Sequence, residues 1–203
     1  MTVLVPIDRL GRWLENFVAR HGATDLSVVD GCLDGRAADG SWFGAIPPFS
    51  SWYDGPADIA SFGAACVPPP DWGVLLVRKG GFAIARLAGN QTVESKVGQR
   101  HVQGRTKAGG QSQQRFARRR DNQARAAYEA AADHAVRLIA DVPVLVTGGD
   151  EGAVRAVLKD SRLDALRRVV PKPHLAEVPE PRRAALDQAI LDACSVRIQV
   201  INA

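Results

Sequence analysis

From about Arg115 to Ala140 the sequence holds neither Gly nor Pro, and this stretch limits the possible folds more than any other. Its apolar residues fall on one helical face. They are Phe116, Ala124, Ala127, Tyr128, Ala131, Ala135, Leu138 and Ile139. A helix of about 25 residues is roughly 37 Å long. The first turns are rich in Arg and the later turns in Ala, so we expect the later half to pack on a core while the first half projects.

The part of the chain before this helix predicts shorter elements. Apolar residues spaced by three and four indicate a helix over 7–21, and DLSVVDG (25–31) is typical of a short strand. Residues 35–71 are rich in Gly, Pro, Ser and Trp, which favours a long irregular segment with one more strand near Ser41–Ala45.

The middle of the chain predicts a β-meander. The run GVLLVRKGGFAIARL holds two β-rich segments joined at Lys79-Gly80-Gly81, as a tight turn requires. QTVESKVGQRHVQ (91–103) alternates apolar and polar residues and is expected to add a third strand.

The C-terminal part predicts alternating strands and helices. VPVLVTGGDEGAVRAVLKD indicates a buried strand, a loop and a helix capped by Asp150, and DALRRVV is expected to end in a strand near Val169. EPRRAALDQAILDA predicts a helix with Pro181 near its start, and SVRIQVI a closing strand. This order predicts an α/β fold in which a mixed β-sheet is flanked by helices, as a single domain over 1–203.

Composition narrows the class of protein. With 46% hydrophobic and 24% charged residues the chain is typical of a globular protein. No apolar run approaches the roughly 20 residues that span a bilayer, and no signal peptide is visible, so we expect a cytoplasmic protein without a membrane partner. The cysteines Cys32, Cys66 and Cys194 are far apart and the four His lack ligand spacing. We therefore predict no disulfide frame, no metal site and no cofactor.

The positive charge is concentrated in one window. Residues 96–125 hold nine basic residues and one acid, so they carry +8 within a chain of net charge +4, which leaves −4 for the rest. One basic element on a neutral to acidic body favours a polyanionic partner that contacts this element.

Several other motifs have simpler explanations than a site. TGGDEG (147–152) lacks the Lys and Ser/Thr of a phosphate-binding loop, and its Asp150 and Glu151 repel phosphate. Cys66 has no nearby base, and no nucleophile elbow marks a Ser-His-Asp site, although one sequence does not exclude such a site. Three tryptophans are more typical of a sealed core flank than of base stacking. They are Trp42, Trp52 and Trp72.

The chemistry is expected in GRTKAGGQSQQRFARRR, residues 104–120. Gly109 and Gly110 lack Cβ atoms, so their backbone enters narrow sites and adopts positive φ. Gln111 offers a carboxamide that donates and accepts hydrogen bonds but does not titrate. Such a group is a poor general base, yet it can hold a water molecule in line with an ester while a backbone N–H stabilises the oxyanion.

The alternative is a solvated loop followed by an Arg-rich helix start. Placed in the first turns of a helix, Arg118, Arg119 and Arg120 oppose the helix dipole. An anionic partner compensates for that cost, so we favour contact with nucleic acid over a bare solvated face.

These residues carry a resemblance to a known family. Gly109-Gly110-Gln111, behind Arg105 and Lys107, resembles the central domain of archaeal and eukaryotic class I peptide-chain release factors. The fuller pattern RTKAGGQSQQRFARRRDNQARAAYEAA is similar to the bacterial Vms-like release factors. The resemblance covers about residues 95–135. It implies a ribonuclease H-related fold with a protruding GGQ loop and a long helix, and action on peptidyl-tRNA in ribosome-associated quality control.

The resemblance is carried over only at matching positions. Gly109 and Gly110 match the paired glycines and Gln111 the release-factor glutamine. Some Vms-like proteins place the key Gln slightly later, so Gln113 competes for the role, and we favour Gln111. The chain shows no stop-codon-reading domain, which makes codon-dependent termination unexpected.

The leading hypothesis is a monomeric, codon-independent peptidyl-tRNA hydrolase. Its partners are the large ribosomal subunit, rRNA and peptidyl-tRNA, which are gripped by a set of basic residues. They are Arg105, Lys107, Arg115, Arg118, Arg119 and Arg120. Two alternatives stay open: an endonuclease that cuts the tRNA 3′ end, and a non-catalytic ribosome- or RNA-binding module.

Overall fold

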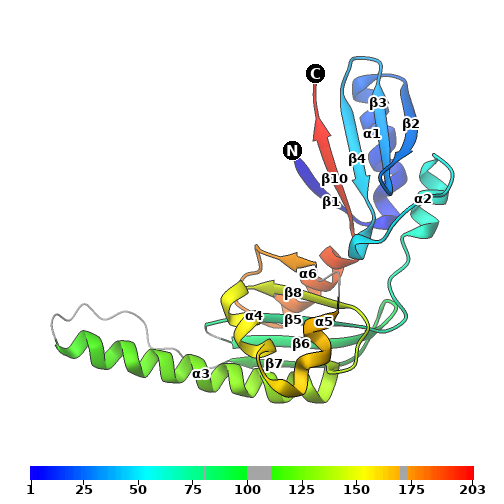
Figure 1. Ribbon diagram of the computed structural model, residues 1–203. Coiled ribbons are helices and arrows are strands. Elements are labelled where there is room, and N and C mark those ends of the chain that lie inside the picture. Colours follow the sequence, from blue (N-terminus) through cyan, green and yellow to red (C-terminus); the bar gives the residue numbers. More distant parts are fainter. Residues whose placement is uncertain (80, 100–110, 170–172) are drawn as a thin grey trace. The chain divides into compact units, whose positions relative to one another are not determined.

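The computed structural model in Figure 1 describes residues 1–79, 81–99, 111–169 and 173–203, with side chains left undescribed over 111–123. The chain forms two compact units, which are described separately. Unit 1 comprises Met1–Pro68 and Ile190–Ala203, and unit 2 comprises Pro69–Ala189. Because two compact units can serve one function, the single catalytic domain over 1–203 stays a prediction.

Unit 1 contains an antiparallel five-stranded sheet in the order β1-β10-β4-β3-β2. Its strands are β1 (Thr2–Val5), β2 (Thr24–Val29), β3 (Cys32–Ala37), β4 (Trp42–Ile46) and β10 (Val196–Ile201). The closing strand β10 lies between β1 and β4, with Thr2 opposite Gln199 and Ile201 opposite Trp42. Unit 1 therefore depends on pairing between the two ends of the chain.

The helical elements of unit 1 are η1 (Ile7–Arg9), α1 (Leu10–His21), η2 (Pro48–Ser50) and α2 (Ile59–Ala65). Phe17 of α1 and Phe43 of β4 meet edge to face, with ring centroids 5.0 Å apart, inside the core of this unit. The predicted helix over 7–21 and the strand near Ser41–Ala45 are confirmed. The irregular segment over 35–71 is wrong in part, because it contains the end of β3 and all of α2.

Unit 2 contains a second five-stranded sheet in the order β7-β6-β5-β8-β9. Its strands are β5 (Trp72–Arg78), β6 (Gly81–Ala88), β7 (Gln91–Gln99), β8 (Leu145–Gly149) and β9 (His174–Leu175). The meander β5-β6-β7 is antiparallel, whereas β8 pairs in parallel with β5 and with β9. The mixed α/β fold is confirmed. The single sheet is wrong, because the strands form two sheets.

The long helix α3 (Gln111–Ile139) has 29 residues and packs on the sheet of unit 2. Among its described side chains, which start at Ala124, Ala127 is the first that is buried, and Figure 1 shows the first half of the helix continuing past the strands. From Gln111 to Ala127 a helix rises about 24 Å. The expected division into a projecting half and an anchored half is confirmed.

The remaining helices follow β8 along the chain, and the last of them passes from unit 2 into unit 1 at Ile190. They are α4 (Glu151–Leu158), η3 (Ser161–Leu163), α5 (Asp164–Arg168) and α6 (Arg183–Ala193). The predicted strand near Val169 is wrong, because Val169 is the C-cap of α5, and the next strand among the described residues is β9. Asp150 caps α4 as predicted, and its carboxylate accepts a hydrogen bond from the Ala153 N–H at 3.0 Å.

Candidate functional site

The predicted site residues fall at the start of α3 and just before it. Four of them lie outside the described residues: Arg105, Lys107, Gly109 and Gly110. The rest belong to the first half of α3, where the backbone is described and the side chains are not. They are Gln111, Gln113, Arg115, Arg118, Arg119 and Arg120. These roles stay predictions, and the described contacts concern the base of the same helix.

The observed start of α3 places the three consecutive arginines farther from the helix N-terminus than expected. The helix begins at Gln111, four residues before the start expected from the sequence. Arg118, Arg119 and Arg120 thus lie beyond the first turn, where the effect of the helix dipole fades. Their cost in the helix is smaller than we inferred, and the case for an anionic partner depends on the charge window itself.

A closely packed core holds the second half of α3. Ala131, Ala135 and Ile139 are fully buried within the core cluster of unit 2. On the strand side, a Cβ at Gly73 of β5 would lie 2.9 Å from Ile139 Cγ2, so this glycine allows close approach of the chain around Ile139. Small residues on both partners bring helix and sheet together and leave little room for α3 to shift.

Ion pairs add contacts between α3 and its neighbours. Arg137 of α3 pairs with Glu94 of β7, and Asp133 of α3 pairs with Arg162 of η3 at 2.7 Å. Each pair is about half exposed or more and so contributes at most about 1 kcal/mol. Their main effect is on the orientation of α3, because they hold it from two sides.

Two cavities flank the base of α3. One of about 320 Å³ lies against β7 and includes Phe82, Lys96 and His134 in its lining. The pKa of His134 is lowered by burial and by the nearby cations Lys96 and Arg137. This imidazole therefore favours its neutral form. Its ring centroid lies 5.5 Å from that of the Phe82 ring.

The second cavity, of about 670 Å³, lies between α3, α4 and the β5-β6 turn. Its lining includes Lys79, Arg125 and Lys159, together with Tyr128. Burial, with a smaller contribution from Asp150, raises the pKa of the Tyr128 phenol, so that the hydroxyl keeps its proton. This cavity could not be predicted from the sequence, because its residues come from three separated segments.

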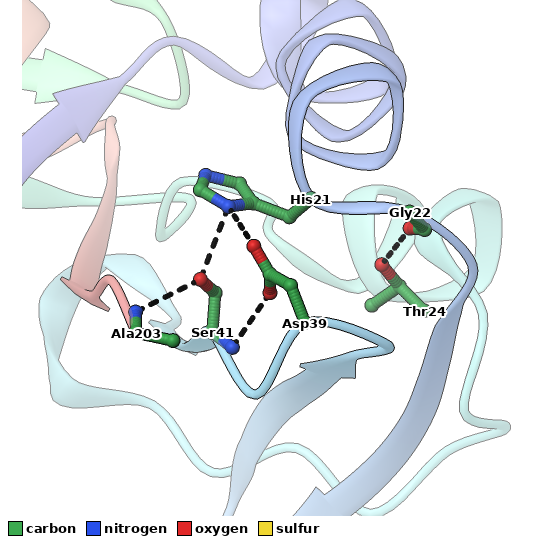
Figure 2. Close-up of polar contacts among 6 residues, drawn as sticks. All are labelled: His21, Gly22, Thr24, Asp39, Ser41 and Ala203. Carbon is green, nitrogen blue, oxygen red and sulfur yellow. Dashed lines mark hydrogen bonds and ion pairs between the residues drawn. The ribbon is translucent and has the colours of Figure 1, made fainter.

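Unit 1 brings a His, an Asp and a Ser together, as Figure 2 shows. His21 Nδ1 lies 2.8 Å from Asp39 Oδ2 and 3.0 Å from Ser41 Oγ. A catalytic triad needs the carboxylate and the hydroxyl on different ring nitrogens, whereas here both lie on Nδ1. Ser41 is only 1% exposed and accepts a hydrogen bond from the Ala203 N–H, so the cluster is structural.

The other motifs keep their simple explanations. Burial raises the pKa of the Cys66 thiol to about 11, which disfavours the nucleophilic thiolate. Trp72 is fully buried and donates to the Gly89 carbonyl, and Trp42 donates to Asp34 Oδ2. Trp52 differs, since it is 72% exposed. No helix in the described part of the chain is long and apolar enough to cross a bilayer.

Comparison with known proteins places the chain among release factors. The family model of the Actinobacteria/chloroflexi VLRF1 release factor matches residues 70–199, which is more than half of the chain and includes all of α3. The chain belongs to this family. The predicted kinship with release factors is confirmed, and the assignment to the Vms-like branch stays a prediction.

Similarity to solved structures and to curated proteins is low. The crystal structure of Archaeoglobus fulgidus Pelota is similar at 9% sequence identity and a TM-score of 0.27, over 94% of this chain and 62% of that chain. The chain therefore spans less than two thirds of that Pelota chain. None of the curated proteins matches.

Proposed function

We propose that this protein hydrolyses the ester of peptidyl-tRNA on stalled large ribosomal subunits, without reading a codon, as part of ribosome-associated quality control. The membership of a release-factor family supports the general class of function. One observation carries the specific proposal: Gln111 is the first residue of a 29-residue helix whose other half packs one face on a hydrophobic core. A residue at the start of such a helix lies at a distance from the sheet, and the packed half of the helix holds it in position.

The chemistry follows from the carboxamide and the helix start. Gln111 holds a water molecule in line with the ester carbonyl, and it does so equally at any pH near neutrality because it does not titrate. The first four N–H groups of a helix have no partner within that helix, so a backbone donor is available for the developing oxyanion. Gly109 and Gly110 give the backbone the freedom to approach the ester, and Gln113 is the second candidate for positioning water.

The basic residues supply affinity for RNA. Arg105, Lys107 and Arg115 lie next to the GGQ sequence, and Arg118, Arg119 and Arg120 follow along α3. They neutralise phosphates of rRNA and of the tRNA acceptor end, which releases counterions. The protein acts as a cytoplasmic monomer in this proposal, and RNA provides much of the reaction pocket.

The test is peptide release from isolated large subunits that carry peptidyl-tRNA. Gln111→Ala is expected to slow release by about 100-fold, because a misplaced reacting group costs about that much. Gln91→Ala, at the exposed start of β7, is the matched control and keeps the parental rate. If Gln111→Ala and Gln113→Ala both release peptide at the parental rate, the mechanism is wrong.

The tRNA product separates the remaining possibilities. Ester hydrolysis leaves tRNA with an intact CCA end, whereas an endonuclease leaves a shortened tRNA. A non-catalytic module binds subunits in a salt-sensitive manner and releases no peptide. Gel mapping of the tRNA 3′ end in the same reactions therefore decides among the three.

A further inference from the structure

Three cations around the larger cavity lack partners among the described residues. Lys79 of the β5-β6 turn, Arg125 of α3 and Lys159 after α4 line the cavity of about 670 Å³, and all three are exposed. None of their side-chain nitrogens makes an ion pair or hydrogen bond within the described part of the chain. Arg86, by contrast, pairs with two carboxylates in the same unit.

The acids in the lining do not neutralise this set. Asp160 is already engaged, because it accepts hydrogen bonds from both the backbone and the guanidinium of Arg162. That leaves Glu129 as the remaining carboxylate of the lining against three cations. A surface that gathers more cations than available carboxylates is stabilised when a polyanion binds.

The position of the cavity indicates which kind of polyanion would bind there. Arg125 is the last residue of the +8 window and follows Arg118 by seven residues, or about two turns of α3. The cavity is within the range of about 300–1,000 Å³ that holds small organic groups, and sugar and phosphate groups are of that size. The basic window of the sequence thus ends at a residue that lines a concave cationic site in unit 2.

We infer that the groove formed by Lys79, Arg125 and Lys159 binds the phosphate backbone of an RNA strand at the base of α3. This inference rests on the proposed function for its choice of RNA, and it adds a second contact to the one proposed near the helix start. Tyr128, whose hydroxyl keeps its proton, supplies a hydrogen-bond donor in the same groove.

The experiment measures how binding depends on salt. Binding of the full chain to purified large ribosomal subunits, and separately to deacylated tRNA, is titrated at several salt concentrations. The triple variant Lys79→Gln, Arg125→Gln and Lys159→Gln is expected to lower the slope of log K against log salt by about 2 to 3, because each phosphate contact contributes about 0.7–0.9. The RNA that shows this loss is the one bound in the groove.

A second triple variant is the matched control. Arg167→Gln, Arg182→Gln and Arg183→Gln remove the same charge from exposed residues of unit 2 that are paired with carboxylates, and the parental slope is expected. Lys159 also lies at the C-terminal end of α4, where the helix dipole stabilises a cation, so thermal unfolding is measured for each variant. Arg125→Gln alone should lower the slope by about 0.7–0.9.

The outcomes separate this inference from the proposed function. An unchanged slope in the groove variant, an equal loss in the control, or a loss of affinity without a change of slope overturns the inference. If peptide release depends on Gln111 but the groove variant keeps the parental salt slope, the proposed function stands and the inference about the groove is wrong. If the groove variant lowers the salt slope but the parent releases no peptide, RNA binding in the groove is supported and the proposed hydrolase activity is wrong.

Discussion

Asp39 is the clearest case of a single residue whose charge the fold sets. Its carboxylate accepts hydrogen bonds from the Ser41 backbone N–H and from His21, each at 2.8 Å. These bonds, with the Ser41 backbone bond as the main cause, lower the pKa of Asp39 below its ordinary value of 3.8. The ionised form is therefore favoured in the folded protein and adds stability to unit 1.

This shift predicts how stability depends on pH. The unfolded chain takes up the proton first as the pH falls, so the contribution of Asp39 is present above pH 3.8 and is lost as the pH falls through the folded-state pKa. The urea concentration at the unfolding midpoint should be higher for the parent than for Asp39→Asn. This difference should narrow as the pH falls through that range. Asp25→Asn, on the exposed face of β2, is the control. A gap of constant size at every pH contradicts the assignment.

At the scale of an element, the anchored half of α3 should tolerate no added volume. Ala131 is fully buried in the core cluster of unit 2. Ala131→Leu is expected to cost about 1–3 kcal/mol of unfolding free energy, because the extra methylenes have no space between helix and sheet. Ala126→Leu lies on the same helix outside that cluster and should cost little. Urea denaturation measures both, and equal losses would show that α3 is not held by close packing at Ala131.

Elements with a strong local pattern could be predicted from the sequence. The β5-β6 hairpin, the capped helix α4 and the long helix α3 each show their period or turn within a few residues. The strand β3 does not, since Gly35 interrupts it and Asp34 and Arg36 are charged. It forms because Phe43 of β4 packs over Gly35, where a Cβ would lie 2.1 Å from the ring. Such pairing is a property of the folded chain and leaves no local signal.

The candidate site likewise has one part that the sequence predicts and another part that only the folded structure brings together. The GGQ sequence and its arginines stand out in a single window, so sequence reasoning finds them, and their roles stay predictions. Lys79 and Lys159 are 80 positions apart and neither is unusual in its own segment. Only the packing of α3 against α4 and the β5-β6 turn brings them to one cavity with Arg125.

At the scale of the whole molecule, each of the two units has its own hydrophobic cluster among the described residues, and the two clusters share no residue. One contains Leu33 and Phe43 in unit 1, and the other contains Leu75 and Ile139 in unit 2. A sheet that closes with both chain ends and a sheet built from the middle of the chain bury separate apolar surfaces. The sequence suggested one sheet because strand membership is decided by pairs such as Thr2 with Gln199, far apart in the chain.

Separate cores predict separate local stabilities. Leu33→Ala should cost about 2–5 kcal/mol in unit 1, because it leaves a cavity in a fully buried position, and Leu75→Ala should do the same in unit 2. Native-state hydrogen exchange measures both variants: Leu33→Ala is expected to reduce the protection of amides in β3 and β4 while those in β5 and β6 keep theirs, and Leu75→Ala should give the reverse. The two variants serve as each other's control. Loss of protection throughout the chain in either variant would show that both cores unfold as one, as expected of the single domain that the sequence predicts.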